Sequence, residues 1–263
     1  MIDPYLEGHY NNRTKVPSHP AIVDGWARDA AAFRAAAPHG ERALAYGASP
    51  RTTMDLFWPA TARDGPVAMF IHGGYWQGLD PSFFSHLAAG PNAHGIAVAV
   101  IGYDLCPQVR LADIVAQIAA AARFLRTRHG RLDVATGHSA GGHLAAMLLA
   151  DGLVPAAVPI SGLFDLRPLV PTTINRALGL DRAEAWRLSP LARPRPAGRL
   201  HAIVGGDEGI EYEGQTRSLA AAWRGTAQVL PGHDHFTLPG LLADPGSALT
   251  DAIRTAVPAS GTA

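Results

Sequence analysis

Gly137-His138-Ser139-Ala140-Gly141 is a Gly-x-Ser-x-Gly pentapeptide that lies between a strand-like and a helix-like stretch of the chain. Residues 132–136 before it are apolar and partly β-branched, whereas residues 143–150 after it are rich in alanine and leucine. A sharp strand-to-helix turn of this kind presents a strained, reactive serine and needs small residues two places before and two places after it. The motif therefore predicts Ser139 as a nucleophile. So short a pattern also arises by chance, so the prediction depends on the rest of the chain.

Strand-like and helix-like stretches alternate on both sides of the motif. We expect further strands at residues 42–46, 53–58, 67–71, 96–101, 156–160, 200–204 and 227–230, and helices at 20–37, 83–89, 111–128, 215–223 and 239–256. Alternation of this kind predicts an α/β fold with a mostly parallel central sheet flanked by helices, the first two strands forming an edge hairpin. The long stretch 163–196 is expected to be a lid-like insertion over the site.

Composition limits the classes of protein that the chain can belong to. Its 263 residues fit a single domain, 1–263, and its 22 basic and 22 acidic residues give no net charge, so no nucleic-acid or membrane partner is expected. The first residues do not read as a signal peptide, and no apolar run reaches the roughly 18 residues that span a bilayer. With Cys106 as its one cysteine, the chain is expected to be cytoplasmic. The sequence leaves the oligomeric state open, a homodimer being one option.

Candidates for the base and the acid that a serine nucleophile requires follow later strands. Gly205-Gly206-Asp207-Glu208 follows the strand at 200–204, and His233-Asp234-His235-Phe236 follows the strand at 227–230. Serine, acid and histidine thus occur in the order seen when such a site lies at the carboxyl ends of a parallel sheet. We favour Glu208 as the acid, with Asp207 as the alternative, and His235 over His233 as the base.

A third element, an oxyanion hole, is expected directly after the strand at 67–71. His72-Gly73-Gly74-Tyr75-Trp76 places a glycine pair where the backbone must turn its N–H groups toward a reacting carbonyl oxygen. The donors are expected to be Gly74, Tyr75 and Ala140. Aromatic residues near these positions are candidates for an aromatic substrate site, although each could equally pack in the core: Tyr75, Trp76, Phe164, Trp186 and Phe236.

Residues 72–76 and Gly-His-Ser-Ala-Gly-Gly-His-Leu at 137–144 resemble the arylformamidases, or kynurenine formamidases, of the α/β-hydrolase superfamily. The resemblance extends to Tyr10-Asn11, 103–107, 160–166 and 234–236, and so covers most of the chain. It implies an α/β-hydrolase fold and hydrolysis of N-formyl-kynurenine to kynurenine and formate through a serine, an acid and a histidine. The family's acid is commonly aspartate, and Glu208 departs from this. The alternative is a carboxylesterase or thioesterase acting on small acyl esters.

Two other classes compete with a serine hydrolase. A metal-dependent hydrolase could use His72, His233, Asp234 and His235, but no helical pair of ligands with the usual spacing is present. A noncatalytic binding protein on the same scaffold would often lack one member of the triad, and here every candidate is present. We therefore expect no metal and no cofactor, and a small-molecule amide or ester as the partner.

Overall fold

A computed structural model describes residues 1–37, 39–60 and 63–258 of the chain. Within these ranges an eight-stranded sheet has the order β1-β2-β4-β3-β5-β6-β7-β8. Its strands are β1 (Gly40–Ala45), β2 (Thr53–Phe57), β3 (Val67–Ile71), β4 (Ala97–Ile101), β5 (Val134–His138), β6 (Ala156–Ile160), β7 (Arg199–Gly205) and β8 (Thr226–Leu230). β1 pairs antiparallel with β2, and β2 with β4, while every other neighbouring pair is parallel. The predicted mostly parallel sheet with an edge hairpin is confirmed.

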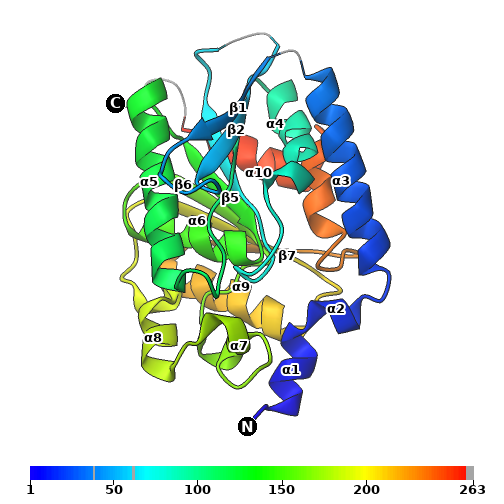
Figure 1. Cartoon of the computed structure of the whole chain (residues 1–263), viewed down its shortest axis with the longest axis vertical. Coiled ribbons are helices and arrows are strands. Elements are labelled where there is room, and N and C mark those ends of the chain that lie inside the picture. The colour runs from blue at the N-terminus through cyan, green and yellow to red at the C-terminus, as the bar shows by residue number, and fades with distance from the viewer. Residues whose placement is uncertain (38, 61–62, 259–263) are drawn as a thin grey trace.

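The described helices also follow the expected order (Figure 1). They are α1 (Pro4–Tyr10), α2 (Asn12–Lys15), α3 (His19–Ala36), α4 (Ala89–Ala93), α5 (Leu111–His129), α6 (Ala140–Ala150), α7 (Asn175–Leu178), α8 (Arg182–Arg187), α9 (Ile210–Trp223) and α10 (Ala248–Ala256). Short 3-10 turns, η1 (Pro81–Phe83), η2 (Ser85–Ala88), η3 (Arg167–Leu169), η4 (Pro190–Ala192) and η5 (Leu238–Ala243), lie between them.

Two of the predicted helices are wrong in detail. The segment 83–89 forms 3-10 turns that lead into α4 instead of one helix. The expected helix 239–256 is divided into η5 and α10, because Pro245 and Gly246 interrupt it and Ser247 starts a new helix. The Ser247 side chain accepts a hydrogen bond from the Thr250 N–H, which is a typical N-terminal cap.

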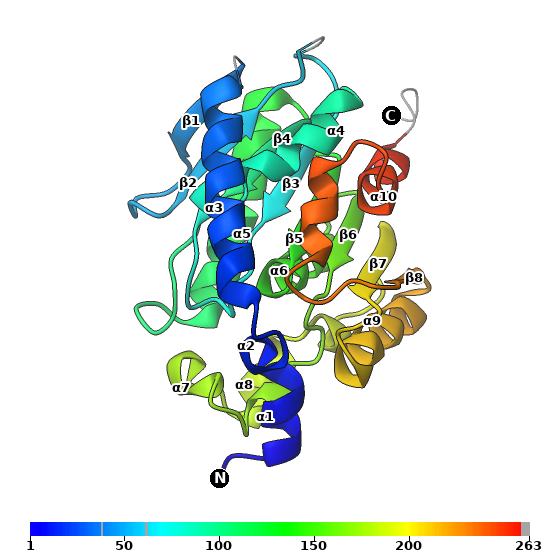
Figure 2. The same cartoon turned by 90° about the vertical axis from the view of Figure 1, so that its right-hand side faces the viewer.

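Helices cover both faces of the sheet, and each face has its own apolar core. Side chains alternate along a strand, so Met69 and Ile71 of β3 pack on one side while Ala68 and Phe70 pack on the other. The first core takes residues from α5, α6 and α9, and the second from α3 and α10. Figure 2 shows α3, α4 and α10 on the near side of the sheet. Burial on both faces explains why the parallel strands are apolar throughout.

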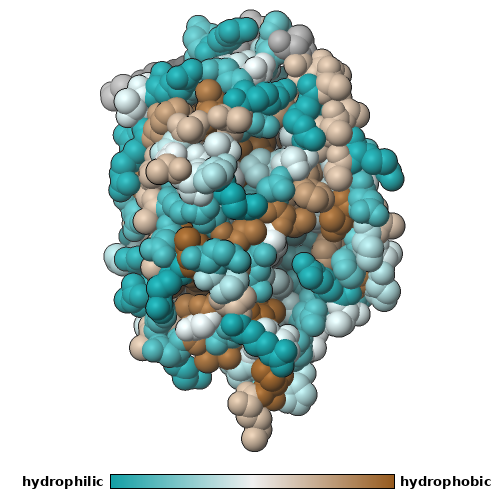
Figure 3. Space-filling model, in the orientation of Figure 1, coloured by the Kyte–Doolittle hydropathy of each residue, from teal (hydrophilic) through white to brown (hydrophobic). Residues whose placement is uncertain are grey.

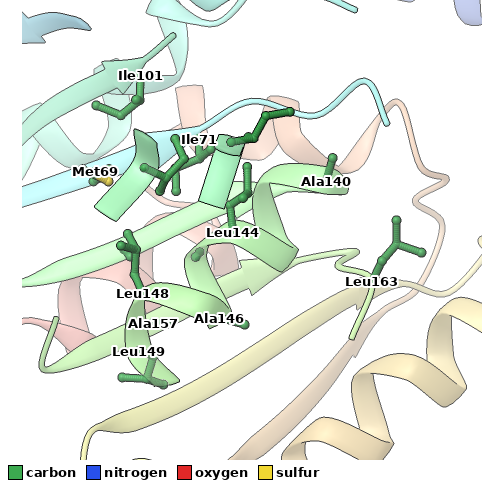
Figure 4. Packing of buried hydrophobic residues seen from close by; sticks show 14 of the residues in the cluster. Met69, Ile71, Ile101, Ala140, Leu144, Ala146, Leu148, Leu149, Ala157 and Leu163 are labelled. Atoms are coloured by element: carbon green, nitrogen blue, oxygen red, sulfur yellow. The ribbon is translucent and has the colours of Figure 1, made fainter. Parts of the chain in front are cut away.

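Helix α6 packs closely on the strands around it, which fixes the turn at Ser139. Figure 4 shows Leu144 and Leu148 of α6 near Ile71 and Met69 of β3, with Ala140 at the start of the helix. At Gly141 a side chain is impossible without movement, because an added Cβ would lie 1.9 Å from the Ile71 carbonyl oxygen. Helix-to-strand packing therefore requires a glycine two places after the serine.

The insertion 163–196 and the N-terminal arm, which we define as residues 1–18, lie together below the sheet (Figure 2). Leu178 and Leu188 of the insertion are buried in the first core. Glu7 of α1 accepts hydrogen bonds from the Thr173 N–H at 2.7 Å and from the Thr173 hydroxyl at 2.6 Å. The insertion is thus packed against the first core and against the N-terminal arm. Its role as a lid stays a prediction.

The described helices and the molecular surface were compared with what a membrane-spanning segment requires. No helix in the described residues is long and apolar enough to cross a bilayer. Figure 3 shows hydrophilic residues over much of one face, interrupted by separate hydrophobic areas.

The packing of α6 on β3 predicts the effect of one methyl group. Gly141→Ala is expected to lower the free energy of unfolding by about 3 kcal/mol, because backbone on both sides must move to admit the Cβ. The matched control is Gly214→Ala in α9, where an added Cβ meets nothing within 4 Å and should raise stability by about 0.5–1 kcal/mol. Urea unfolding of both variants measures this. Equal effects of the two substitutions would contradict the packing account.

Candidate active site

Ser139 occupies a strained turn between β5 and α6. Its φ of 57° and ψ of −117° lie in a region that L-residues rarely adopt. The Ser139 N–H donates to the Ile160 carbonyl oxygen at 2.8 Å, which ties the turn to the end of β6. In the described part of the chain no hydrogen bond occupies the Ser139 hydroxyl. The serine is thus held by its backbone while its side chain stays available.

His235 and Glu208 form a buried pair beside this turn. His235 Nδ1 lies 2.6 Å from Glu208 Oε2, and the two residues are 5% and 1% exposed. The other carboxylate oxygen, Oε1, accepts hydrogen bonds from the Gly205 N–H at 2.7 Å and from the Ser161 hydroxyl. Of the two acids predicted from the sequence, Glu208 thus contacts His235, whereas Asp207 is exposed to solvent. A bond to Nδ1 leaves Nε2 as the ring nitrogen that is free to accept a proton.

Ser139 and His235 line one cavity of about 640 Å³. Gly74, Tyr75 and Phe236, three of the residues expected in the site, line it as well. A cavity of this volume accommodates a small organic molecule.

Three aromatic residues expected in the substrate site lie elsewhere, which corrects the prediction. Trp76 is fully buried, with its ring edge on His143 at a centroid distance of 5.1 Å. Phe164 is fully buried in the first core. Trp186 is 38% exposed and stacks under the Arg167 guanidinium at 4.1 Å. Each ring therefore packs against other parts of the chain. Its position in the sequence near a site residue did not predict this.

The glycine pair after β3 makes the turn that the predicted oxyanion hole needs. Gly74, Tyr75 and Trp76 all have positive φ, of 104°, 51° and 57°. At Gly74 an added Cβ would lie 2.4 Å from the Gly78 carbonyl oxygen. In the described ranges the N–H groups of Gly74, Tyr75 and Ala140 donate to no protein acceptor. Of these residues, Gly74 and Tyr75 line the cavity, whereas Ala140 is buried at the start of α6 beside Ser139.

The N-terminal arm and the start of α3 form a wall of the cavity that sequence reasoning missed. Its lining includes Asn12 and Arg13 of α2, and His19 and Trp26 of α3. Asn12 is only 3% exposed. The resemblance at Tyr10-Asn11 and the polar run Asn11-Asn12-Arg13 at the start of α2 were the signals in this part of the chain, and nothing in their spacing points to Ser139.

A buried network of hydroxyl groups joins this arm to the oxyanion loop. The Tyr75 hydroxyl lies 2.7 Å from the Tyr212 hydroxyl and also donates to the Tyr10 carbonyl oxygen. Asn12 Nδ2 donates to the Tyr212 hydroxyl at 2.7 Å. Burial raises the pKa of Tyr75 and of Tyr212, so both phenols stay neutral. The network holds the arm, α9 and the loop after β3 in one arrangement.

Three buried histidines surround the turn and are neutral near pH 7. Burial lowers the pKa of His72 and of His143 to about 4 in each case. Burial, with a contribution from nearby His235, also lowers the pKa of His138. The His138 ring packs on the His235 ring at a centroid distance of 4.5 Å.

The structure also bears on the competing metal site. Among residues 1–37, 39–60 and 63–258, no group of three or more histidine, cysteine, aspartate or glutamate side chains is arranged to hold a metal ion. His72 instead stacks between Tyr103 and Phe84, at centroid distances of 4.2 and 5.9 Å. Its Nδ1 lies 2.8 Å from the Gly73 carbonyl oxygen.

Known proteins similar to this chain are hydrolases. A family model described as BD-FAE matches residues 54–153. Kynurenine formamidase of Salmo salar is 27% identical over 229 residues, which cover 78% of this chain and 78% of that protein. Kynurenine formamidase of Drosophila melanogaster is 27% identical over 224 residues, 74% of each chain.

Solved structures agree on the fold. A proposed thioesterase from Silicibacter sp. TM1040 is 34% identical, with a TM-score of 0.89, and the match covers 95% of this chain and 98% of that one. Esterase B from Lactobacillus rhamnosis (HN001) is 21% identical, with a TM-score of 0.70 and coverage of 92% and 96%, and it supports the fold alone.

The sheet order, the strained serine turn and these relatives define the class of the protein: it is a hydrolase of the α/β-hydrolase superfamily. Within that superfamily the chain is similar to kynurenine formamidases, at 27% identity over about three quarters of its length, and to the proposed thioesterase of Silicibacter sp. TM1040. This confirms the resemblance seen in the sequence.

The buried histidines predict loss of stability in acid. Between pH 6.5 and about 4 the unfolded chain binds protons at His72 and His143 that the folded chain does not, so the free energy of unfolding falls as pH falls. Each histidine contributes up to about 1.4 kcal/mol per pH unit. Denaturant unfolding across this range measures the slope. His143→Gln should make it shallower, and the same substitution at exposed His94 should not; identical slopes would contradict the assignment.

Proposed function

We propose that the chain is a serine hydrolase that cleaves an N-formyl aryl amide, N-formyl-kynurenine, to the aryl amine and formate. One observation carries the proposal. Ser139 and the Glu208-bound His235 line a single cavity together with the aromatic side chains Trp26 and Phe236, in a chain whose relatives include kynurenine formamidases. The cavity thus combines a nucleophile, a base and aromatic surface for an aryl leaving group.

The first half of the proposed reaction forms a formyl-enzyme. His235 Nε2 takes the hydroxyl proton of Ser139 while the serine oxygen attacks the formyl carbon. The oxyanion that forms is bound by the N–H groups of Tyr75 and Ala140, with Gly74 as a further donor. The carbon–nitrogen bond then breaks, and the proton held by His235 passes to the departing aryl amine.

Water completes the cycle by the same route. His235 takes a proton from a water molecule, whose oxygen attacks the formyl-enzyme, and the proton then returns to the Ser139 oxygen as formate leaves. Glu208 stabilises the imidazolium that forms in each half. Its buried carboxylate accepts the Nδ1–H and so fixes both the orientation and the tautomer of His235.

An ester or thioester substrate is the second candidate. The similar Silicibacter sp. TM1040 structure is named as a proposed thioesterase, and it matches nearly the whole chain. The same nucleophile and base would serve, with an alcohol or thiol leaving in place of an aryl amine. The two candidates differ in what the leaving-group side of the cavity must bind.

Substrate comparison with a serine control tests the proposal. The kcat/KM for N-formyl-kynurenine is expected to exceed that for short nitrophenyl esters by at least about tenfold, because aromatic contacts act on the leaving group. Ser139→Ala should reduce both by at least about a thousandfold. Hydrolysis of the esters without hydrolysis of the formamide would favour the second candidate. Activity retained in Ser139→Ala would contradict the mechanism.

A further inference from the structure

Two charged side chains in the cavity wall have no protein partner. Arg13 of α2 and Asp24 of α3 both line the cavity that contains Ser139. Within the described ranges neither makes a hydrogen bond or an ion pair. Both side chains are exposed, so each charge is open to solvent and to a ligand in the cavity. The cavity thus presents one free cation and one free anion of the described chain to a ligand.

The residues that flank Arg13 are anchored to the proposed catalytic loops. Asn12 is buried and donates to the Tyr212 hydroxyl at 2.7 Å. Lys15 donates through Nζ to the backbone carbonyl of Glu208. The backbone that carries Arg13 is therefore fixed on both sides. Binding of a ligand to its guanidinium then costs little conformational entropy of the backbone in this segment.

Aromatic and aliphatic side chains line the same cavity as the two charges and Ser139. The rings of Trp26 and Phe236 lie 6.1 Å apart between centroids at an interplanar angle of 27°, and both line the cavity. Ile174 of the insertion and Val23 of α3 add aliphatic lining. A ligand that fills the cavity therefore meets a nucleophile, apolar and aromatic side chains, and two opposite charges.

We propose that Arg13 and Asp24 recognise the α-amino acid group of the substrate. The Arg13 guanidinium binds the α-carboxylate and the Asp24 carboxylate binds the α-ammonium, while the aryl ring contacts Trp26 and Phe236 and the formyl group lies at Ser139. A guanidinium and a carboxylate form paired, charge-assisted hydrogen bonds. This inference rests on the proposed function and adds to it the two residues that recognise the amino acid group of the substrate.

The recognition is expected to favour the charged substrate over a neutral one. Hydrogen bonds to charged groups are strong enough to change affinity by about 10- to 100-fold when one partner is removed. A neutral aryl formamide or a nitrophenyl ester makes neither contact. Loss of Arg13 or Asp24 should therefore affect only substrates that carry the matching charge, and should act mainly on KM.

Three substrates and three variants test this assignment. The substrates are N-formyl-L-kynurenine, its des-amino analogue, which keeps the carboxylate, and ortho-formamidoacetophenone, which has neither charge. The variants are Arg13→Gln, Asp24→Asn and the control Arg28→Gln, an exposed arginine of α3 outside the cavity lining. Steady-state kcat and KM are measured for each combination.

Arg13→Gln is expected to lower kcat/KM about 10- to 100-fold for both carboxylate substrates and by less than about twofold for ortho-formamidoacetophenone. Asp24→Asn should lower it only for N-formyl-L-kynurenine, and Arg28→Gln for none. Equal losses on all three substrates, or no loss, would overturn the recognition and leave the proposed function intact. If the unmodified protein hydrolyses none of the three formamides, the proposed function fails instead, and this inference fails with it.

A binding measurement separates recognition from turnover. Calorimetry measures the Kd of L-kynurenine for Ser139→Ala protein. Adding Arg13→Gln to this protein should raise that Kd about 10- to 100-fold. Binding of ortho-aminoacetophenone should not change. An unchanged Kd for L-kynurenine would contradict the role of Arg13.

Discussion

The hydrogen bond between Glu208 and His235 is the interaction on which the site depends. A carboxylate that is 1% exposed is costly to bury unless its oxygens are satisfied, and here the Gly205 N–H, the Ser161 hydroxyl and His235 Nδ1 satisfy them. These donors come from the ends of β6 and β7 and from the loop after β8. The parallel order of these strands therefore brings together the donors that stabilise the buried Glu208 carboxylate. That carboxylate in turn orients His235.

The same sheet explains which features the sequence could predict. The buried strands are continuous apolar runs, so their positions, the parallel sheet and the turn at Ser139 followed from local patterns. Chain order placed Glu208 and His235 just after strands, although the contact between them joins residues that are 27 positions apart. Pro245 and Gly246 interrupt the segment 239–256, and the prediction of one continuous helix there did not take these two residues into account.

Features that depend on long-range packing were beyond local patterns. Trp76 and Phe164 are aromatic and near motif residues, yet packing against other elements buries both away from the cavity. The N-terminal arm enters the site through contacts such as Asn12 with Tyr212, which are 200 residues apart. Periodicity carries no information about such pairs. The cavity that results is lined by Ser139 and His235 at the sheet's end and by residues of the arm and α3 on another wall.

The rate at which a fluorophosphonate probe labels Ser139 tests most directly whether the buried pair activates this serine. The account predicts stoichiometric labelling at Ser139, detected by peptide mass, that is about a thousandfold to ten-thousandfold slower in Glu208→Gln, because a neutral amide cannot stabilise the imidazolium. The same change at exposed Asp207, Asp207→Asn, should leave the rate within about twofold of the original. Labelling of Glu208→Gln at the unmodified protein's rate, or no labelling of Ser139 at all, would contradict the account.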